Sequence, residues 1–320
     1  MRVLITGATG LIGGEIVSLC HQHNIGVNYL TTSRKKIVSQ EKFQGFYWNP
    51  DTQEIDLEAF DGVAAIINLA GANISKRWTE SYKKEIVSSR INSLKTLHKA
   101  LALVDSKTIS SFVSASAIGV YPDSLSSFYT EDETKVDDSF LGEVVETWET
   151  EMDTFKIFEM NLAKVRIGLV VSAEGGALPE MAKPIKNYVG AAFGSGEQWQ
   201  SWVHINDLAR IFLFVVENSL SGIYNAVGPN PVTNEKLVKE IAKVLKKPLV
   251  LPNIPKFIMR VLLGEMSYLL FASQRVSSQK IEGEGFVFNY NNICVALEEI
   301  YEKKGSAESV STLYKKEYSS

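Results

Sequence analysis

Hydrophobic residues follow two alternating patterns from the N-terminus to about residue 174. Short, nearly continuous apolar runs predict buried strands. Between them, apolar residues recur every three or four positions, which predicts helices over residues 79–104 and 139–158. Buried strands that alternate with helices are typical of a parallel sheet covered on both faces, so we expect an α/β, Rossmann-type doubly wound fold. The predicted strands cover residues 3–5, 27–32, 45–48, 63–71, 110–116 and 164–171.

The pattern changes after residue 174. Glycine-rich loops, aromatic residues and longer gaps replace the regular alternation, and helices are predicted over 234–246 and 256–271. The second of these is apolar nearly all round, so we expect it to be buried under a cap; contact with a membrane or a hydrophobic substrate is the alternative. The predicted organisation is a nucleotide-binding domain at 1–174 and a smaller, helix-rich cap or substrate portion at 175–304, with some segments returning to the first domain. Residues 305–320 lack apolar periodicity and are predicted to be a mobile tail.

A glycine-rich turn joins the first strand to the first helix. Its glycines have separate physical tasks: Gly7 turns the chain sharply, Gly10 lets the backbone approach a pyrophosphate, and Gly13 lets the helix pack close to the strand. Free N–H groups at the helix start attract phosphate. A glycine-rich turn that binds nothing is the alternative, but strand, turn and helix together favour dinucleotide binding. The other residues of this predicted cofactor-binding segment are Thr9, Leu11 and Ile12.

The end of the second strand indicates which dinucleotide is bound. NAD-binding folds usually place an acidic residue there to hold the ribose 2′-hydroxyl. This chain has Ser33 and Arg34, followed by two lysines. A hydroxyl and a guanidinium bind a 2′-phosphate that a carboxylate would repel. We therefore predict NADP(H) as the cofactor; a solvated basic loop is the alternative.

Composition narrows the class of protein. The 320 residues are 45% hydrophobic and 22% charged, as in ordinary globular proteins, and the net charge of −4 argues against a nucleic-acid surface. The four histidines and two cysteines lack metal-ligand spacing, so no metal site is expected and Cys20 and Cys294 are predicted to be buried free thiols. The first strand begins too early for a signal peptide, and residues 257–271 are too short to span a bilayer. We expect a cytoplasmic protein with no membrane partner.

Several motifs resemble those of the extended short-chain dehydrogenase/reductase superfamily: TGATGLIG, NLAG, SASAIGVY, VRIGLVV and WVHINDLA. The longer strings NLAGANISKRWTESYKKEIVSSRI and FGSGEQWQSWVHINDLA are similar to one atypical branch, the NAD-dependent epimerase/dehydratase-like "epimerase family protein", also described as sugar-nucleotide epimerase-like. The resemblance covers about residues 1–303. It implies a doubly wound sheet, NADP(H) and a helical cap on the substrate side.

The superfamily's usual chemistry needs a tyrosine and a lysine four residues apart on one helix, where the ammonium lowers the pKa of the phenol. No tyrosine of this chain has a lysine at that spacing. The resemblance places Phe140 and Val144 at the two positions, as in the atypical branch. A phenyl ring cannot donate a proton, so the standard mechanism is not expected.

The resemblance also suggests further cofactor contacts. Leu69, Ala70 and Gly71 would lie along the adenosine and pyrophosphate, and Val170 would contact the nicotinamide end through its backbone or by packing. Arg90 would reach a phosphate or ribose, and Glu85 would hold adenine or ribose donors. A solvated helix face is the alternative for Glu85 and Arg90.

Residues that could carry chemistry lie at the fifth strand and after it. Ser116 matches the superfamily's substrate-polarising serine, with Ser114 as a rival and a packed small residue as the alternative. Tyr121 is the nearest phenol, with a core or lid position as the alternative. His204 could shuttle protons but is predicted to be structural. Three tryptophans could line a substrate cleft or pack between cap and domain: Trp78, Trp199 and Trp202.

These observations predict an NADP(H)-binding oxidoreductase or epimerase-like enzyme acting on a small or nucleotide-sugar-like substrate, as a monomer or homodimer. The missing tyrosine–lysine pair supports an alternative, a non-catalytic NADP(H)-binding sensor or scaffold.

Overall fold

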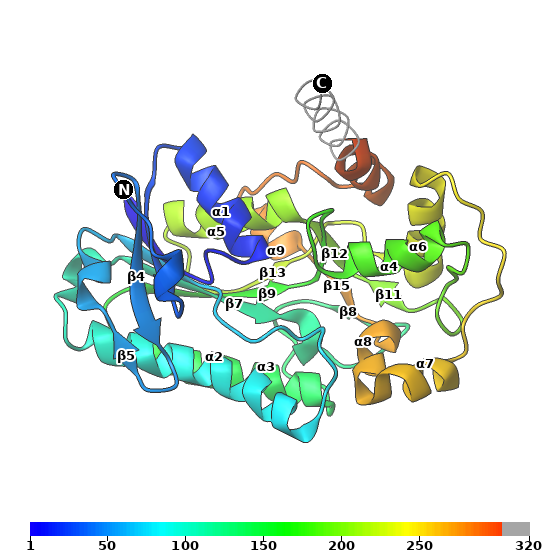
Figure 1. The fold of residues 1–320 in the computed structure, drawn as a ribbon, viewed down its shortest axis with the longest axis horizontal. Coiled ribbons are helices and arrows are strands. Elements are labelled where there is room, and N and C mark those ends of the chain that lie inside the picture. The colour runs from blue at the N-terminus through cyan, green and yellow to red at the C-terminus, as the bar shows by residue number, and fades with distance from the viewer. Residues whose placement is uncertain (303–320) are drawn as a thin grey trace, which may run out of the picture.

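The structure, a computed structural model, describes residues 1–302 and is built around a central β-sheet with helices on both faces (Figure 1). The predicted α/β, doubly wound fold is confirmed. The described residues contribute nine strands to this sheet: β1 (Arg2–Thr6), β2 (Gly26–Thr31), β3 (Ser39–Gln40), β4 (Phe43–Asn49), β5 (Glu54–Ile55), β6 (Ala65–Asn68), β7 (Ser111–Ala117), β9 (Asn161–Ile167) and β13 (Gly222–Ala226).

The sheet order is β13-β9-β7-β6-β1-β2-β4-β3, and β5 pairs with β4. All pairs from β13 to β4 are parallel, whereas β3 and β5 are antiparallel. The chain runs from β1 to β2 in one direction and later from β6 to β7 in the other. Ligands of doubly wound sheets bind in the crevice at the carboxyl ends of the strands where this reversal occurs. In this fold the crevice lies beyond the ends of β1 and β6.

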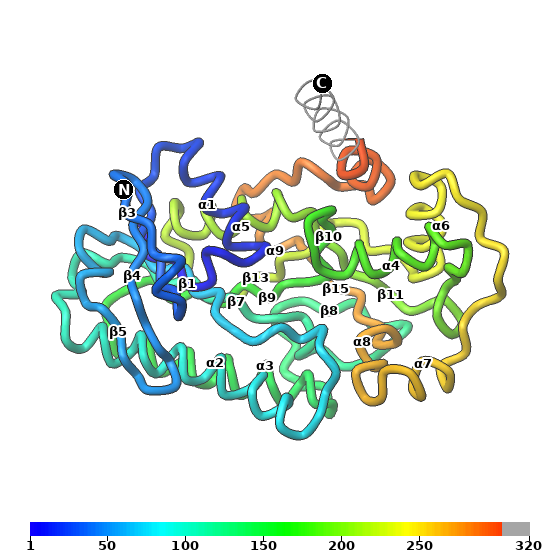
Figure 2. The backbone as a smooth tube through the Cα atoms, in the orientation of Figure 1, coloured from blue at the N-terminus to red at the C-terminus, as the bar shows by residue number. Residues whose placement is uncertain are grey.

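Helices form a layer on each face of the sheet. On one face α1 (Leu11–Gln22) contacts α5 (Ile205–Glu217), and on the other α2 (Glu80–Leu101) contacts α3 (Phe140–Asp153), as the tube view also shows (Figure 2). Both α2 and α3 begin at a residue whose hydroxyl caps the helix, Thr79 and Ser139. The 3₁₀ helices are η1 (Arg34–Lys36), η2 (Leu57–Phe60), η3 (Ser106–Thr108), η4 (Ile118–Val120), η5 (Thr154–Ile157) and η6 (Gly264–Ser267).

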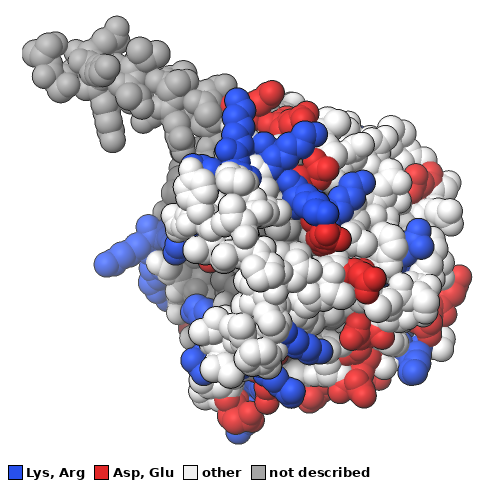
Figure 3. Space-filling view, turned by 90° about the vertical axis from the view of Figure 1, so that its right-hand side faces the viewer, with Lys and Arg blue, Asp and Glu red and all other residues white. Residues whose placement is uncertain are grey.

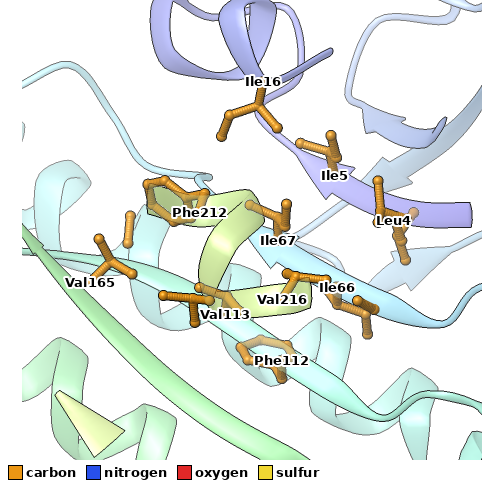
Figure 4. Close-up of a cluster of buried hydrophobic side chains, with 14 of the residues drawn as sticks. Leu4, Ile5, Ile16, Ile66, Ile67, Phe112, Val113, Val165, Phe212 and Val216 are labelled. Atoms are coloured by element: carbon orange, nitrogen blue, oxygen red, sulfur yellow. The ribbon is translucent and has the colours of Figure 1, made fainter. Parts of the chain in front are cut away.

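The core lies on both faces of the central strands, against α1 and α5 on one side and α2 and α3 on the other; Figure 4 shows part of it. Leu4, Ile5, Ile66 and Ile67 come from the two strands that flank the crevice and are completely buried. Burying each such side chain contributes about 1.5–3 kcal/mol relative to leaving it exposed. The buried apolar side chains of β1 and β6 therefore fix the position of the strand ends that form the crevice.

The C-terminal portion contains α4 (Ala177–Lys186), α6 (Asn234–Val244), α7 (Lys256–Leu263), α8 (Tyr268–Phe271), α9 (Gln279–Gly283) and a last helix at 293–302. Three two-stranded sheets brace it: β10 (Leu169–Val171) with β12 (Trp202–His204), β11 (Trp199–Gln200) with β14 (Val232–Thr233), and β8 (Phe128–Tyr129) with β15 (Arg275–Val276). β13, α5 and α9 from this portion pack with the first domain.

The predicted strand at 164–171 is wrong as a single element, because the chain breaks at Gly168. β9 stays in the main sheet, whereas β10 pairs with β12. A Cβ atom at Gly168 would lie 2.2 Å from the Ser201 carbonyl oxygen, so only glycine permits this close crossing. The break directs β10 away from the sheet and toward the crevice side.

The prediction that 256–271 is one buried helix is also wrong. Gly264, with φ of +63°, ends α7, and η6 and α8 complete the segment. α7 has no buried residue, and its exposed side chains include Phe257 and Val261. The reason is geometric: α8 turns back onto the nucleotide domain, whereas α7 continues along the surface.

The two cysteines lie in different environments. Cys20 is a buried free thiol as predicted, but Cys294 is only partly buried. Within residues 1–302, no helix combines the length and apolarity needed to cross a bilayer, and no cluster of three metal-binding side chains occurs. The predicted tail at 305–320 lies outside the described residues.

Candidate functional site

The turn between β1 and α1 has the close packing that its glycines predict. Gly7 adopts φ of +71°, and a Cβ atom there would lie 3.1 Å from the Leu69 carbonyl oxygen. A Cβ atom at Gly13 would lie 2.2 Å from the Gly7 carbonyl oxygen. The turn and the start of α1 therefore touch backbone to backbone, which leaves a concave cradle that a larger side chain would fill.

The start of α1 is open to a ligand. Its N-cap residue is Gly10, which has no side chain to bond the first N–H groups, and the first turn contains no acidic residue. Thr9 and Gly10 are exposed, while Leu11 and Ile12 are partly buried. An uncapped helix N-terminus with exposed backbone donors suits the phosphates of a dinucleotide.

A threonine joins this turn to the end of β6. The Thr6 hydroxyl oxygen accepts the N–H groups of Leu69 and Ala70 at 2.9 and 3.0 Å and donates to Asn68 Oδ1 at 2.7 Å. Asn68 in turn donates to the Ser114 hydroxyl at 3.0 Å. Sequence reasoning missed the roles of Thr6 and Asn68, although both interrupt apolar runs at strand ends. They hold the Leu69–Ala70 backbone against the glycine turn.

Ser33 and Arg34 lie at the end of β2, beside the end of β1 in the parallel sheet. The Arg34 side chain is 70% exposed, with its guanidinium carbon 3.8 Å from the centre of the Tyr47 ring. One guanidinium nitrogen lies 3.7 Å from a carboxylate oxygen of Glu54. Tyr47 thus orients the guanidinium, and Glu54 is a weak competitor because an exposed ion pair contributes about 0–1 kcal/mol.

Arg90 points from α2 to the loop that follows β6. A Cβ atom at Gly71 would lie 3.1 Å from the Arg90 guanidinium carbon, and Arg90 donates to the carbonyl oxygens of Ile86 and Ala72. Among residues 1–302 its buried Nε has no hydrogen-bond partner, and burial lowers the pKa of the guanidinium to about 10. A desolvated cation without a carboxylate partner attracts an anion. Glu85 is exposed on the same helix.

Val170 reaches the same crevice through β10 and the loop after it. Cβ atoms at Gly175 and Gly176 would lie 3.7 and 3.5 Å from the Leu11 side chain. The loop that follows β10 therefore contacts the Leu11 side chain at the start of α1. The structure thus brings together the glycine turn, the Leu69–Gly71 loop and this later loop around one crevice, with Ser33 and Arg34 at its β2 side.

Ser116 and Tyr121, the predicted catalytic residues, lie in a buried polar network. Ser116 donates to Glu149 at 2.5 Å, and Arg166 donates to both oxygens of that carboxylate at 2.9 Å. The Tyr121 hydroxyl accepts from Arg166 at 2.9 Å and donates to Asn225 at 2.8 Å. Burial raises the pKa of Tyr121. Burial also lowers the pKa of Arg166, but the Glu149 carboxylate and the Tyr121 hydroxyl together raise it by more.

The hydroxyl groups of Ser116 and Tyr121 both form hydrogen bonds within the protein. The exposed fraction of Ser116 is 2% and that of Tyr121 is 0%, so neither hydroxyl can contact a substrate as it stands. The complete burial of Tyr121 matches the core position given as the alternative to a catalytic role, and its two hydrogen bonds connect Arg166 of β9 with Asn225 of β13. Sequence reasoning missed Glu149, Arg166 and Asn225, which lie on elements far apart in the chain.

An apolar wall stands at the start of α3, where the resemblance predicts no proton donor. The Phe140 ring lies 5.1 Å from the Trp78 ring, and the Lys83 ammonium lies 5.4 Å from the Phe140 ring centre. Val144 is buried in the same cluster, against which Met266, Tyr268 and Leu269 of the cap pack. The η6–α8 segment thus packs on the α2–α3 side of the crevice.

A tyrosine and an aspartate, both absent from the sequence prediction, fasten this cap. The Tyr268 hydroxyl bonds both carboxylate oxygens of Asp137 at 2.9 Å, and a Lys83–Glu265 ion pair lies beside it. Burial and the Asp137 carboxylate raise the pKa of Tyr268. The pairing resists loss of the phenol proton, so Tyr268 holds the cap as a neutral hydrogen-bond donor.

His204 has a structural position. It is 4% exposed, its Nδ1 accepts the Asn206 N–H at the start of α5, and its ring lies 3.9 Å from that of Tyr290. Of the three tryptophans, Trp78 and Trp202 are buried, and Trp199 is partly exposed beside the Arg275 guanidinium. Core packing explains Trp78 and Trp202.

Comparison with known proteins gives a consistent picture. Residues 3–141 match the NAD dependent epimerase/dehydratase family, and 254–300 match a domain of unknown function (DUF1731). An "epimerase family protein" of Staphylococcus haemolyticus is 36% identical over 300 residues, which cover 93% of this chain and 98% of the relative.

Two solved structures are similar over 94% of the chain at 27% identity. The human epimerase family protein SDR39U1 (isoform 2) with NADPH has a TM-score of 0.81, and 99% of it is covered. The nucleoside-diphosphate sugar epimerase of Corynebacterium glutamicum has a TM-score of 0.74, and 58% of it is covered.

Proposed function

Because the chain belongs to the NAD-dependent epimerase/dehydratase family, in the group of epimerase family proteins, we propose that it is an NADP(H)-binding oxidoreductase or epimerase-like enzyme. Its substrate would be a small or nucleotide-sugar-like molecule, the class that the Corynebacterium relative is named for. The observation that carries the proposal is the cradle at the start of α1, where Gly7 and Gly13 leave backbone donors open beside the basic end of β2.

The residues around the crevice fit each part of a phosphorylated dinucleotide. The backbone of 7–13 would hold the pyrophosphate, and Ser33 and Arg34 the 2′-phosphate. Leu69, Ala70 and Gly71 would line the adenosine side with backbone groups, and Arg90 would meet an anionic or ribose oxygen. A bound nicotinamide supplies reversible hydride transfer at its C4 atom. The chain's own contribution is to orient the substrate and exclude water beneath the cap.

The end of β2 supports NADP(H) over NAD(H). Neither Asp nor Glu follows β2 within the next several residues, and Ser33, Arg34, Lys35 and Lys36 stand there instead. The human relative contains NADPH. A guanidinium that Tyr47 orients can form charge-assisted hydrogen bonds with a phosphate, each about twice as strong as a neutral one.

Calorimetry with NADPH and NADH tests the cofactor. We expect NADPH to bind more tightly, and Arg34→Ala to weaken NADPH by roughly ten- to a hundredfold while NADH changes little, because only NADPH carries the 2′-phosphate. Arg260→Ala is the matched control, since Arg260 is also exposed but lies on α7. Equal affinities for the two nucleotides in the unchanged protein would contradict the NADP(H) assignment.

A second candidate function is a non-catalytic NADP(H)-binding sensor or scaffold. It is favoured by the apolar wall of Phe140 and Val144 and by the burial of Ser116. A panel of carbonyl compounds and nucleotide sugars with NADPH oxidation as readout separates the two. The enzyme proposal is supported if the protein oxidises NADPH and Ser116→Ala abolishes this turnover without changing the NADPH affinity. In that case Ser116 becomes accessible when the substrate binds. A complete blank in a protein that binds NADPH supports the sensor.

A further inference from the structure

One surface of the cap is strongly apolar and uncovered. Four large side chains of α7 are exposed: Phe257 by 67%, Ile258 by 38%, Val261 by 76% and Leu262 by 60%. The pairs 257/261 and 258/262 are four residues apart, so all four lie on one face of the helix. We call this face, with the adjoining segment 246–255, the α7 surface.

The segment before α7 also exposes large apolar side chains. Val250 and Leu251 are 63% and 47% exposed. Monomeric proteins rarely expose this many large apolar side chains together, and such patches mark sites of interaction. Figure 3, which views the molecule from the side where α7 and α6 lie, shows broad areas without charged side chains, with both basic and acidic groups around them.

The charge of the α7 surface differs from that of the whole chain. Residues 246–264 contain Lys246, Lys247, Lys256 and Arg260 and no acidic residue, whereas the chain has a net charge of −4. Within residues 1–302 none of these four cations forms an ion pair; Lys256 lies over the Phe271 ring, and Lys247 donates to the Tyr188 hydroxyl. Lys256 and Arg260, which belong to α7 itself, therefore remain available at the border of its apolar face.

An apolar helix face with basic residues along its border is the pattern of helices that lie in a membrane interface. The apolar side chains enter the boundary of the acyl chains, while lysine and arginine contact anionic headgroups. A second copy fits less well, because a two-fold contact through this surface would bring like charges together. We propose that the α7 surface binds the surface of an anionic lipid bilayer, with the helix lying flat rather than crossing it.

Vesicle co-sedimentation of the full chain tests the proposal. It should bind mixed phosphatidylcholine–phosphatidylglycerol vesicles and bind pure phosphatidylcholine vesicles much more weakly. Val261→Ser should lower the affinity about tenfold, since a side chain that enters the bilayer is lost. Val287→Ser is the matched control, because Val287 is 72% exposed elsewhere on the molecule, and it should bind as the unchanged protein does.

The charges are tested separately. Replacing Lys256 and Arg260 by glutamine should weaken vesicle binding about fivefold for each charge removed. Added salt should also weaken vesicle binding. NADPH affinity should be unchanged in every variant, which shows that each is folded. Absence of sedimentation overturns the proposal, as does equal loss with Val261→Ser and Val287→Ser. A concentration-dependent dimer in light scattering that Val261→Ser abolishes overturns it in favour of self-association.

Discussion

The two ends of the crevice use polar groups in opposite ways. At the end of β1, backbone N–H groups and the exposed Arg34 are open to a ligand, and the buried Arg90 Nε has no hydrogen-bond partner among the described residues. At the ends of β7 and β9, Ser116, Glu149 and Arg166 satisfy one another in a buried network. One end is thus preorganised for an anion, and the other stabilises the fold. This difference is the reason that the proposed cofactor residues stand out in the sequence, whereas residues for the chemical step do not.

Glu149→Gln is the strongest test of the buried end, because it leaves the Arg166 guanidinium buried without a full negative partner. We expect the free energy of unfolding to fall by about 3–5 kcal/mol, measured by denaturant titration. NADPH affinity of the folded fraction should not change.

Asp153→Asn is the matched control. Asp153 also forms ion pairs from the end of α3, but its side chain is 41% exposed, and its buried partner Lys164 keeps a hydrogen bond to the Glu149 carbonyl oxygen. This substitution should cost no more than about 1 kcal/mol. If Glu149→Gln and Asp153→Asn destabilised equally, the network would not be the structural element described above.

Gly13→Ala tests the open end. Its Cβ atom would meet the Gly7 carbonyl oxygen at 2.2 Å, so α1 must shift from the turn. We expect a loss of about 1–3 kcal/mol in thermal unfolding and a loss of most NADPH affinity, because the cradle is distorted. A variant with unchanged NADPH affinity would show that the cradle does not bind the cofactor.

The next residue supplies the control for that change. Gly14 lies in the same helix with nothing within 4 Å of its would-be Cβ atom. Gly14→Ala should therefore stabilise the protein by up to about 1 kcal/mol through helix propensity. It should leave nucleotide binding unchanged.

Cys20, on the buried side of α1, should have a smaller effect on the free energy of unfolding, and this effect depends on pH. Burial raises the pKa of its thiol from 9.0 to about 12. The unfolded chain loses this proton first as pH rises, so stability is constant below about pH 9 and falls above it, by at most about 1.4 kcal/mol per pH unit. Denaturant titrations of the unchanged protein and Cys20→Ala between pH 8 and about 11 should differ in slope. Parallel curves would mean that the thiol is solvated.

Local sequence determined much of the fold and of the cofactor end. Apolar runs located the strands because parallel strands are buried on both faces, and the glycine spacing located the turn because backbone contacts there exclude a Cβ atom. A position for Ser33 and Arg34 beside the turn could be predicted, because in a doubly wound fold the strand after such a turn lies beside the first strand. These features depend on neighbours within a few residues or on one regular repeat of the fold.

Tertiary structure alone decided the rest. Ser116, Glu149 and Arg166 are brought together by packing of β7, α3 and β9, and no sequence spacing indicates it. The close crossing at Gly168 divided a continuous apolar run into two strands. The same limit applies to α7, whose apolar composition predicted burial, because whether an apolar helix is covered depends on what else folds against it. The sequence determined the periodicity and the polarity of each element, whereas only the assembled chain determined its partners.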